Sequence, residues 1–309
     1  MSLLEVANVS KSYQAGNRFG RRHRVQAVAE ASFSINDGDC LGLVGESGSG
    51  KSTLGRLVVG LERPDGGRVD FRGVPVGRLR RDKKLQSGIQ MVFQDSSQAV
   101  NPIFTARSII AEPLKNFYGL SGRALEGRIA ELLEAVGLPP SEGGKLPSQF
   151  SGGQLQRICV ARALAADPKL IVLDEPLRSL DVSVQAQIIN LLEDLRARLG
   201  VSYLLISHDL EAVYNLATGL AVMFAGRVVE AIDDISFFGQ LKHPYSKALM
   251  AAADFCLADS PCPEAEAGFA PGGCAYSTRC PVASKDCLAS VPETTVLSPG
   301  HRLACFHCG

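Results

Sequence analysis

The chain has 309 residues, of which 46% are hydrophobic and 21% charged, and its 32 basic residues balance its 32 acidic ones. These values predict a globular protein of two domains, or of one domain and a tail, with a sizeable core. The apolar runs are too short for a membrane-spanning helix, and the zero net charge argues against a dedicated nucleic-acid binder.

The N-terminal half contains alternating strand and helix patterns. Residues 1–13 alternate like a first strand and show no signal-peptide pattern, which predicts a cytoplasmic protein. Residues 41–45 form a short apolar strand that leads into a glycine-rich segment, and residues 52–61 have helical periodicity. A further buried strand is predicted at 89–94, and the pattern from about 105 to 137 is helical.

The following segments predict more strands of the same sheet. Residues 169–176 form a strongly apolar strand that ends in two carboxylates, and residues 201–210 form a strand that ends at a histidine. Residues 220–231 resemble a hairpin with its turn at Ala225 and Gly226. Strands that alternate with helices predict an α/β fold, with a parallel sheet covered by helices on both faces.

The composition changes after residue 237, which predicts a domain boundary. We expect a nucleotide-binding domain at 1–236, with a helical subdomain at about 97–165, and a C-terminal extension at 237–309. The extension begins with a short helix near 243–255, followed by a Pro/Gly/Ala linker at 260–273. Seven of the nine cysteines follow residue 255, whereas Cys40 and Cys159 lie in apolar contexts and are predicted core residues.

Residues 45–52 satisfy the pattern G-x-x-x-x-G-K-[ST] between a strand and a helix. Glycines allow positive φ, successive N–H groups curve around an anion, and the helix N-terminus adds partial positive charge. Lys51 can reach the terminal phosphates and Ser52 can bind Mg²⁺, whereas the alternative is a flexible Gly/Ser turn. The predicted contacts of the nucleotide here are Gly45, Glu46, Ser47, Gly48, Ser49, Gly50, Lys51, Ser52 and Thr53.

Two carboxylates follow the strand at 169–176. Asp174 can hold Mg²⁺ directly or through water, and Glu175 can polarise a water for attack on the γ-phosphate. The alternative is a pair of solvated carboxylates at a strand end. The phosphate-binding loop favours the first interpretation, because a bound Mg²⁺–nucleotide needs such partners.

The segment FSGGQLQRICVARAL at 150–164 resembles the signature motif of ABC-transporter ATPases, with Phe150 in place of the usual Leu. The order and spacing of the other motifs agree over about 230 residues of the chain. Gln94 matches the Q-loop, LDEP the Walker B motif, SLD at 179–181 the D-loop, and His208 the switch histidine. The resemblance implies a P-loop NTPase fold with a RecA-like core, a helical subdomain and an antiparallel β subdomain.

The resemblance also implies roles for these residues. Glu175, His208 and Gln94 would be catalytic, and Ser52, Gln94 and Asp174 would surround Mg²⁺. Two subunits would close head to tail over ATP, each presenting its helix end to the nucleotide held by the other. The remaining nucleotide contacts implied are Tyr13 against adenine, Asp181, and the signature residues Ser151, Gly152, Gly153 and Gln154. Arg178 and Ser179 depart from the usual family pattern, with an effect that the sequence leaves open.

Several strings, including VGESGSGKSTLGRL and HPYSKALM, resemble the oligopeptide, dipeptide and nickel importer branch, and most of all its second ATPase. This branch implies two permeases, a second ATPase and an extracytoplasmic solute-binding protein as partners, with the chain peripheral at the cytoplasmic face of the membrane. The solute stays open among dipeptides, oligopeptides, nickel and metal chelates. The alternatives are a non-transport ABC ATPase that acts on nucleic acid or ribosomes, and a module that does not hydrolyse ATP.

The tail carries cysteines at C-x5-C-x6-C-x17-C spacing, with an added C-x2-C. Four thiolates can hold zinc or a [4Fe–4S] cluster, and unligated thiols are a third alternative. The resemblance implies the iron–sulfur cluster, with Cys308 as a substitute for Cys305 and with Cys256 and Cys262 as linker residues. The predicted ligands are Cys274, Cys280, Cys287 and Cys305.

Overall fold

Two β-sheets organise the chain. The computed structural model describes residues 2–15, 23–253 and 272–308. A four-stranded sheet has the order β2-β1-β4-β5, and an eight-stranded sheet has the order β11-β12-β10-β9-β3-β8-β7-β6. The predicted Cys256 and Cys262 and most of the predicted linker lie outside the described residues.

The smaller sheet is antiparallel and combines long and short strands. Its strands are β1 (Ser2–Ala15), β2 (His23–Asn36), β4 (Gly66–Phe71) and β5 (Val74–Pro75). Apolar side chains such as Leu4 and Val6 are buried, and alternate residues point the other way, as a half-buried strand requires. The sheet packs into a common core with one face of the larger sheet.

The centre of the larger sheet is parallel. Its parallel strands are β3 (Cys40–Val44), β6 (Ile89–Val92), β7 (Leu170–Asp174), β8 (Ser202–Ser207) and β9 (Gly219–Phe224). All residues of β3, β7, β8 and β9 are buried, because layers cover both faces of a parallel sheet and its strands read as continuous apolar runs. The predicted strands are therefore confirmed, and Cys40 and Cys159 are fully buried as expected.

Helices α1 (Lys51–Val58), α2 (Lys83–Ser87), α6 (Val182–Leu199) and α7 (Leu210–Leu216) follow strands of the fold. Helix α1 lies directly on the sheet at Gly55, where an added Cβ would stand 2.7 Å from Ile206 Cδ1 and 3.2 Å from Val172 Cγ1. This close packing fixes the axis of the helix that begins at the phosphate-binding loop.

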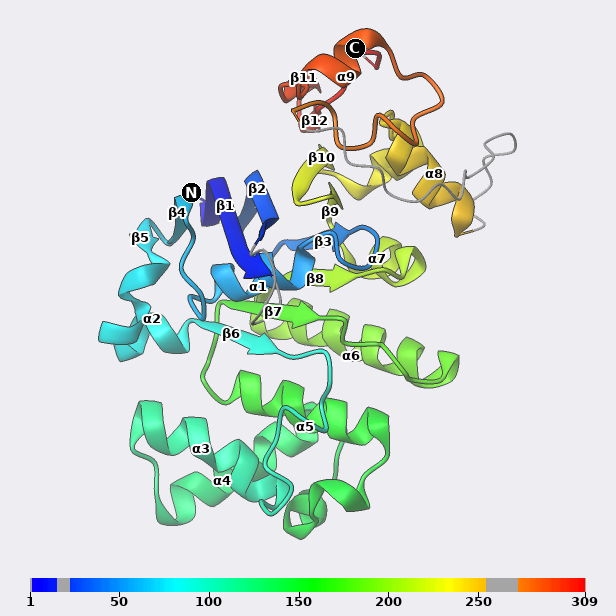
Figure 1. Ribbon diagram of the computed structural model, residues 1–309. Coiled ribbons are helices and arrows are strands. Elements are labelled where there is room, and N and C mark those ends of the chain that lie inside the picture. Colours follow the sequence, from blue (N-terminus) through cyan, green and yellow to red (C-terminus); the bar gives the residue numbers. More distant parts are fainter. Residues whose placement is uncertain (1, 16–22, 254–271, 309) are drawn as a thin grey trace.

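Three helices form a separate group at the end of the molecule opposite the C-terminal residues (Figure 1). They are α3 (Ala106–Tyr118), α4 (Gly122–Ala135) and α5 (Gly152–Leu164). The helical pattern at 105–137 is divided because Gly119, with φ of 65°, ends α3, a conformation that glycine adopts at little cost. Short 3₁₀ turns occur at Val76–Arg81, Pro140–Gly144, Pro147–Gln149 and Ile235–Gln240.

The C-terminal segment returns to the large sheet. Strand β10 (Arg227–Ile232) forms the predicted hairpin with β9, turning at Ala225 and Gly226 with positive φ. After α8 (Pro244–Ala252) and α9 (Lys285–Ala289), strands β11 (Thr295–Ser298) and β12 (His301–Leu303) form a second hairpin, and β12 pairs with β10. Among the described residues no helix has the length and apolarity to cross a bilayer.

Candidate nucleotide site

The phosphate-binding loop connects β3 to α1 in the conformation that the motif predicts. Gly45, Gly48 and Gly50 have φ of 152°, 80° and 103°. Gly50 is also confined, because an added Cβ would stand 2.0 Å from the Ala27 carbonyl oxygen. Glycine is needed there for both reasons, and α1 begins immediately afterwards at Lys51.

Lys51 is buried within the loop. Its Nζ donates to the carbonyl oxygens of Gly45 at 2.7 Å and Glu46 at 2.9 Å. Burial lowers its pKa, which the carboxylates of Glu175, Asp174 and Glu46 partly counteract. A desolvated ammonium group of this kind gains by contact with an anionic ligand such as a triphosphate.

Ser52 and Asp174 meet at the carboxyl ends of the strands. Ser52 Oγ donates to Asp174 Oδ1 at 2.9 Å, although the two residues are 122 positions apart. Asp174 is buried, and burial raises the pKa of its carboxyl group. The hydrogen bond from Ser52 lowers this pKa, and the charge of Glu175 raises it, each by a smaller amount. A hydroxyl and a desolvated carboxylate are oxygen ligands suited to Mg²⁺, which would also stabilise the ionised carboxylate.

Glu175 and His208 form the next pair along this edge. His208 Nδ1 lies 2.6 Å from Glu175 Oε2, and the side chains are 61% and 11% exposed. The Glu175 backbone has φ of 49°, an uncommon conformation for a residue with a side chain. Its N–H donates to the Ile206 carbonyl oxygen at 2.9 Å, which fixes the carboxylate beside the phosphate-binding loop.

A cavity of about 440 Å³ joins these groups. Arg178, which sequence analysis singled out only as a departure from the family pattern, also lines it; its guanidinium is a cation that phosphate groups attract. The residues that line the cavity are Ala27, Ser47, Gly48, Gly50, Lys51, Ser52, Thr53, Gln94, Glu175, Arg178 and His208. The other predicted site residues of the loop do not line the cavity but contact Lys51 Nζ; they are Gly45, Glu46 and Ser49. Asp174 contacts the lining residue Ser52.

The predicted signature residues lie at the start of α5 and do not line this cavity. Ser151 caps α5: its Oγ accepts from the Gln154 N–H at 3.3 Å, and Gln154 Oε1 accepts from the Ser151 N–H at 3.0 Å. Gly152 is exposed, and at Gly153 an added Cβ would stand 2.3 Å from Val184 Cγ1. Asp181 begins α6 close to this corner.

Tyr13 is 37% exposed on β1 and also lies outside the cavity lining. Its hydroxyl donates to Glu62, which accepts from Arg56 Nε at 2.8 Å. Lys11 Nζ lies 5.7 Å from the centre of the Tyr13 ring. Within the chain, the Tyr13 hydroxyl is therefore bonded to Glu62 and one face of the ring is near Lys11.

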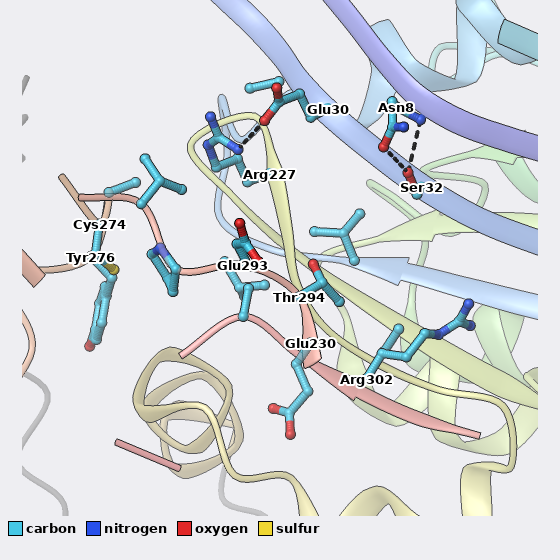
Figure 2. A pocket seen from close by; sticks show the side chains of 18 residues that line it. Asn8, Glu30, Ser32, Arg227, Glu230, Cys274, Tyr276, Glu293, Thr294 and Arg302 are labelled. Atoms are coloured by element: carbon cyan, nitrogen blue, oxygen red, sulfur yellow. Dashed lines mark hydrogen bonds and ion pairs between the residues drawn. The ribbon is translucent and has the colours of Figure 1, made fainter. Parts of the chain in front are cut away.

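A second cavity, of about 500 Å³, lies between the two sheets and the C-terminal segment (Figure 2). Its arginines are paired within the chain: Arg227 with Glu30 at 2.9 Å, and Arg302 with Asp233 at 2.7 Å. Cys274 and Tyr276 of the C-terminal segment are among its lining residues. Because the arginines of this second cavity are already neutralised by carboxylates, the cavity at the phosphate-binding loop is the better anion site.

The four predicted cysteine ligands lie near one another. Burial raises the pKa of the Cys274 and Cys280 thiols, and the nearby Cys287 and Cys305 raise it further. Cys305 Sγ lies 3.4 Å from Cys308 Sγ. Within the described ranges, however, no three His, Cys, Asp or Glu side chains are arranged to hold a metal ion.

Comparisons with known proteins identify the family of the chain. The family model for ABC transporters matches residues 28–178. The chain is 38% identical to the oligopeptide transport ATP-binding protein AppF of Bacillus subtilis, over 98% of this chain and 97% of that protein. It is 45% identical to the nickel import ATP-binding protein NikE of Brucella suis, over 82% of this chain and 95% of that protein.

Among solved structures, the dimeric post-hydrolysis state of the ATP-binding cassette MJ0796, bound to ADP and phosphate, has a TM-score of 0.65 and 29% identity. The match covers 73% of this chain and 96% of that chain. The predicted fold class is thereby confirmed.

Proposed function

Because this chain belongs to the ATP-binding proteins of the ABC transporter family, we propose that it is the subunit of an importer whose ATP hydrolysis drives peptide uptake through partner permeases. The observation that carries the proposal is the cavity in which the phosphate-binding loop, Gln94, Glu175 and His208 meet. The full-length similarity to an oligopeptide transport ATP-binding protein supports peptides as the solute class.

In the proposed reaction the loop N–H groups and Lys51 hold the phosphates, and Lys51 exchanges its carbonyl partners for phosphate oxygens. Ser52, Gln94 and Asp174 would surround Mg²⁺, which when bound neutralises charge on the β- and γ-phosphates. Glu175 would accept a hydrogen bond from the attacking water, and His208, at 2.6 Å from Glu175, would orient that carboxylate.

We propose that the site is completed by a second ATPase subunit. The helix end at Ser151 and Gly152 is exposed and does not line this chain's own cavity, so the partial positive charge of the α5 N-terminus faces solvent, where a nucleotide held by another subunit could meet it. Head-to-tail pairing of two ATPases, as a heterodimer of paralogues, would then trap ATP at both contacts. Asp181, at the start of α6, would lie at the same contact.

The permease contact is proposed beside the helical group. A groove of about 330 Å³ runs between the large sheet and α3, and includes Phe93, Pro113 and Phe117. It adjoins Gln94, which lines the nucleotide cavity, so a segment seated in the groove is one residue away from the catalytic site. A groove lined by both apolar and polar side chains, Glu112 and Arg162 among them, suits an amphipathic helix of a membrane partner, and it would place the chain at the membrane surface.

Nickel or a metal chelate is the second candidate solute. The NikE relative has the higher identity, 45%, but its alignment covers 82% of this chain against 98% for AppF. Uptake of a radiolabelled dipeptide, a pentapeptide and ⁶³Ni²⁺ by vesicles that hold the assembled importer would separate the candidates. Peptide uptake that requires ATP and is absent in Glu175→Gln is expected; nickel uptake alone, or co-purification with RNA in place of permeases, would refute the peptide proposal.

We further propose that Cys274, Cys280, Cys287 and Cys305 hold a [4Fe–4S] cluster. Four cysteine thiols, of which Cys287 and Cys305 affect the pKa of the other two, supply the donor type of such a cluster, although in the described residues they are not arranged as a metal site. Protein purified without oxygen should contain iron and sulfide and absorb in the visible range. Cys280→Ser should lose this absorption and Cys308→Ser should keep it, whereas zinc without iron, or neither metal, would contradict the cluster.

A further inference from the structure

The C-terminal segment reaches the phosphate-binding loop through Arg279. Its guanidinium donates two hydrogen bonds to the Glu46 carboxylate, from Nη1 to Oε2 at 2.9 Å and from Nη2 to Oε1 at 2.8 Å. The two residues are 233 positions apart. A bidentate arginine–carboxylate pair fixes both distance and orientation, unlike a single ion pair.

A second contact holds the same loop residue. The Glu46 backbone N–H donates to the Tyr245 hydroxyl oxygen of α8 at 2.8 Å. Both the side chain and the main chain of Glu46 are therefore held by residues that follow the nucleotide-binding motifs in the sequence. The Gly45 carbonyl oxygen, which belongs to the same peptide group as this N–H, accepts from Lys51 Nζ at 2.7 Å, so Tyr245 helps to orient a peptide group that contacts the lysine facing the phosphates.

The anchoring residues are themselves rigidly packed. Tyr245, Tyr276 and Phe224 form an aromatic cluster with ring centres 4.5 to 5.4 Å apart. The Arg279 guanidinium lies over Phe224 and Tyr276 at 5.7 and 5.6 Å, and its side chain is only 13% exposed. An arginine held against aromatic faces loses little freedom when it binds a carboxylate.

The pair also changes the charge near the anion site. Glu46 is a carboxylate inside a loop that binds phosphate, and unpaired it would repel a triphosphate. The Arg279 charge neutralises it at hydrogen-bond distance.

We propose that Arg279 and Tyr245 are positioning residues of the phosphate-binding loop, acting through Glu46 to raise the affinity of the site for MgATP. The C-terminal extension thereby sets nucleotide affinity whatever solute the importer carries and whether or not its thiols hold a metal.

The test measures binding of the fluorescent nucleotide mant-ATP with Mg²⁺ by the purified full chain, and KM and kcat for ATP in the assembled importer. Arg279→Gln should raise Kd and KM about tenfold, which corresponds to about 1.4 kcal/mol, and leave kcat at saturating ATP within about twofold. Arg279→Lys, which keeps the charge without the bidentate geometry, should fall between wild type and Arg279→Gln. Tyr245→Phe, which removes one oxygen atom, should raise Kd about threefold.

Arg302→Gln is the matched control, because Arg302 lies in the same extension and pairs with Asp233 away from the loop. A folded Arg279→Gln protein that binds mant-ATP as tightly as Arg302→Gln would overturn the proposal. So would an equal effect of Arg279→Gln in a Glu46→Gln background, where the expected further change is below about twofold. If Arg279→Gln does not fold, an unchanged Kd in Tyr245→Phe overturns it instead.

Discussion

Replacement of Glu175 by glutamine removes the basic carboxylate and leaves the local geometry in place. Glutamine has the same shape, and its amide can still hydrogen-bond to His208 Nδ1, which lies 2.6 Å from the carboxylate. The backbone strain at φ of 49° is common to both residues, because neither is glycine. The free energy of unfolding should therefore change by less than about 0.5 kcal/mol.

The effect on hydrolysis should be large. The Glu175 side chain is only 11% exposed, so bulk water cannot replace it as the base that activates the attacking water. Loss of a positioned base costs about 10²- to 10⁴-fold, and we expect kcat to fall about 10³-fold, or about 4 kcal/mol in the activation barrier. Mant-ATP affinity should stay within about twofold, since in the proposed site the loop and Lys51 hold the phosphates and Glu175 contacts the attacking water.

Phosphate release by the assembled importer at saturating MgATP measures this effect. Glu193→Gln is the control, because Glu193 is an exposed carboxylate on α6 and its replacement makes the same change in charge. A Glu175→Gln rate within tenfold of the Glu193→Gln rate would refute the assignment of Glu175 as the base. A fall in mant-ATP affinity as large as the fall in kcat would refute the claim that Glu175 acts in hydrolysis and not in nucleotide binding.

Four further outcomes are expected. Asp174→Asn should raise the melting temperature of the nucleotide-free protein by a few degrees, because burial disfavours the charged carboxyl group. The same variant should lose the rise in melting temperature that MgATP gives wild type. An unchanged MgATP effect would contradict a metal-binding role for Asp174. Burial lowers the pKa of His243 to about 4, although nearby Glu230 opposes this. Between about pH 6.5 and 4 the folded protein therefore binds fewer protons than the unfolded protein, and the stability present above pH 6.5 falls as the pH drops through this window. In urea titrations at several pH values His243→Asn should lose less stability over this window than wild type, and an unchanged pH profile would contradict the assignment. Tyr203→Phe removes a buried hydroxyl that donates to the Leu192 carbonyl oxygen at 3.1 Å and should cost about 1 kcal/mol in urea unfolding with kcat unaltered. Tyr13→Ala should weaken mant-ATP binding about tenfold if the ring stacks on adenine, whereas Tyr13→Phe should bind like wild type; equal binding by all three proteins would exclude stacking.

The sequence predicts the centre of this fold well because its strands are buried on both faces. Residues 170–174 and 202–207 are fully buried, and within them residues 170–173 and 203–206 appear in the sequence as apolar runs, which is the pattern of a parallel sheet. Strand β12 is different, since its three residues His301–Leu303 join the sheet by pairing with β10. No local pattern marks so short a strand, and its position depends on a contact between distant segments.

In the site, too, short motifs predict some residues, whereas contacts between distant segments cannot be predicted from the sequence. Motif spacing predicts Lys51, Glu175 and His208, because each follows a strand whose carboxyl end lies at the same sheet edge. The pairing of Glu46 with Arg279 has no motif, because the loop motif predicts Glu46 only as a nucleotide contact and Arg279 alone resembles an ordinary surface charge. Only the folded chain brings them together, through the aromatic cluster around Tyr276.

The addition of β12 to the large sheet has a practical consequence for work on shortened forms of the protein. If the chain were cut after residue 236, β10 would lose the partner of Glu230, Ala231 and Ile232, and its main-chain N–H and C=O groups would face solvent. Open edges of this kind recruit strands from other molecules. A trimmed domain would then self-associate without nucleotide, and an experimenter could mistake that aggregation for pairing driven by ATP.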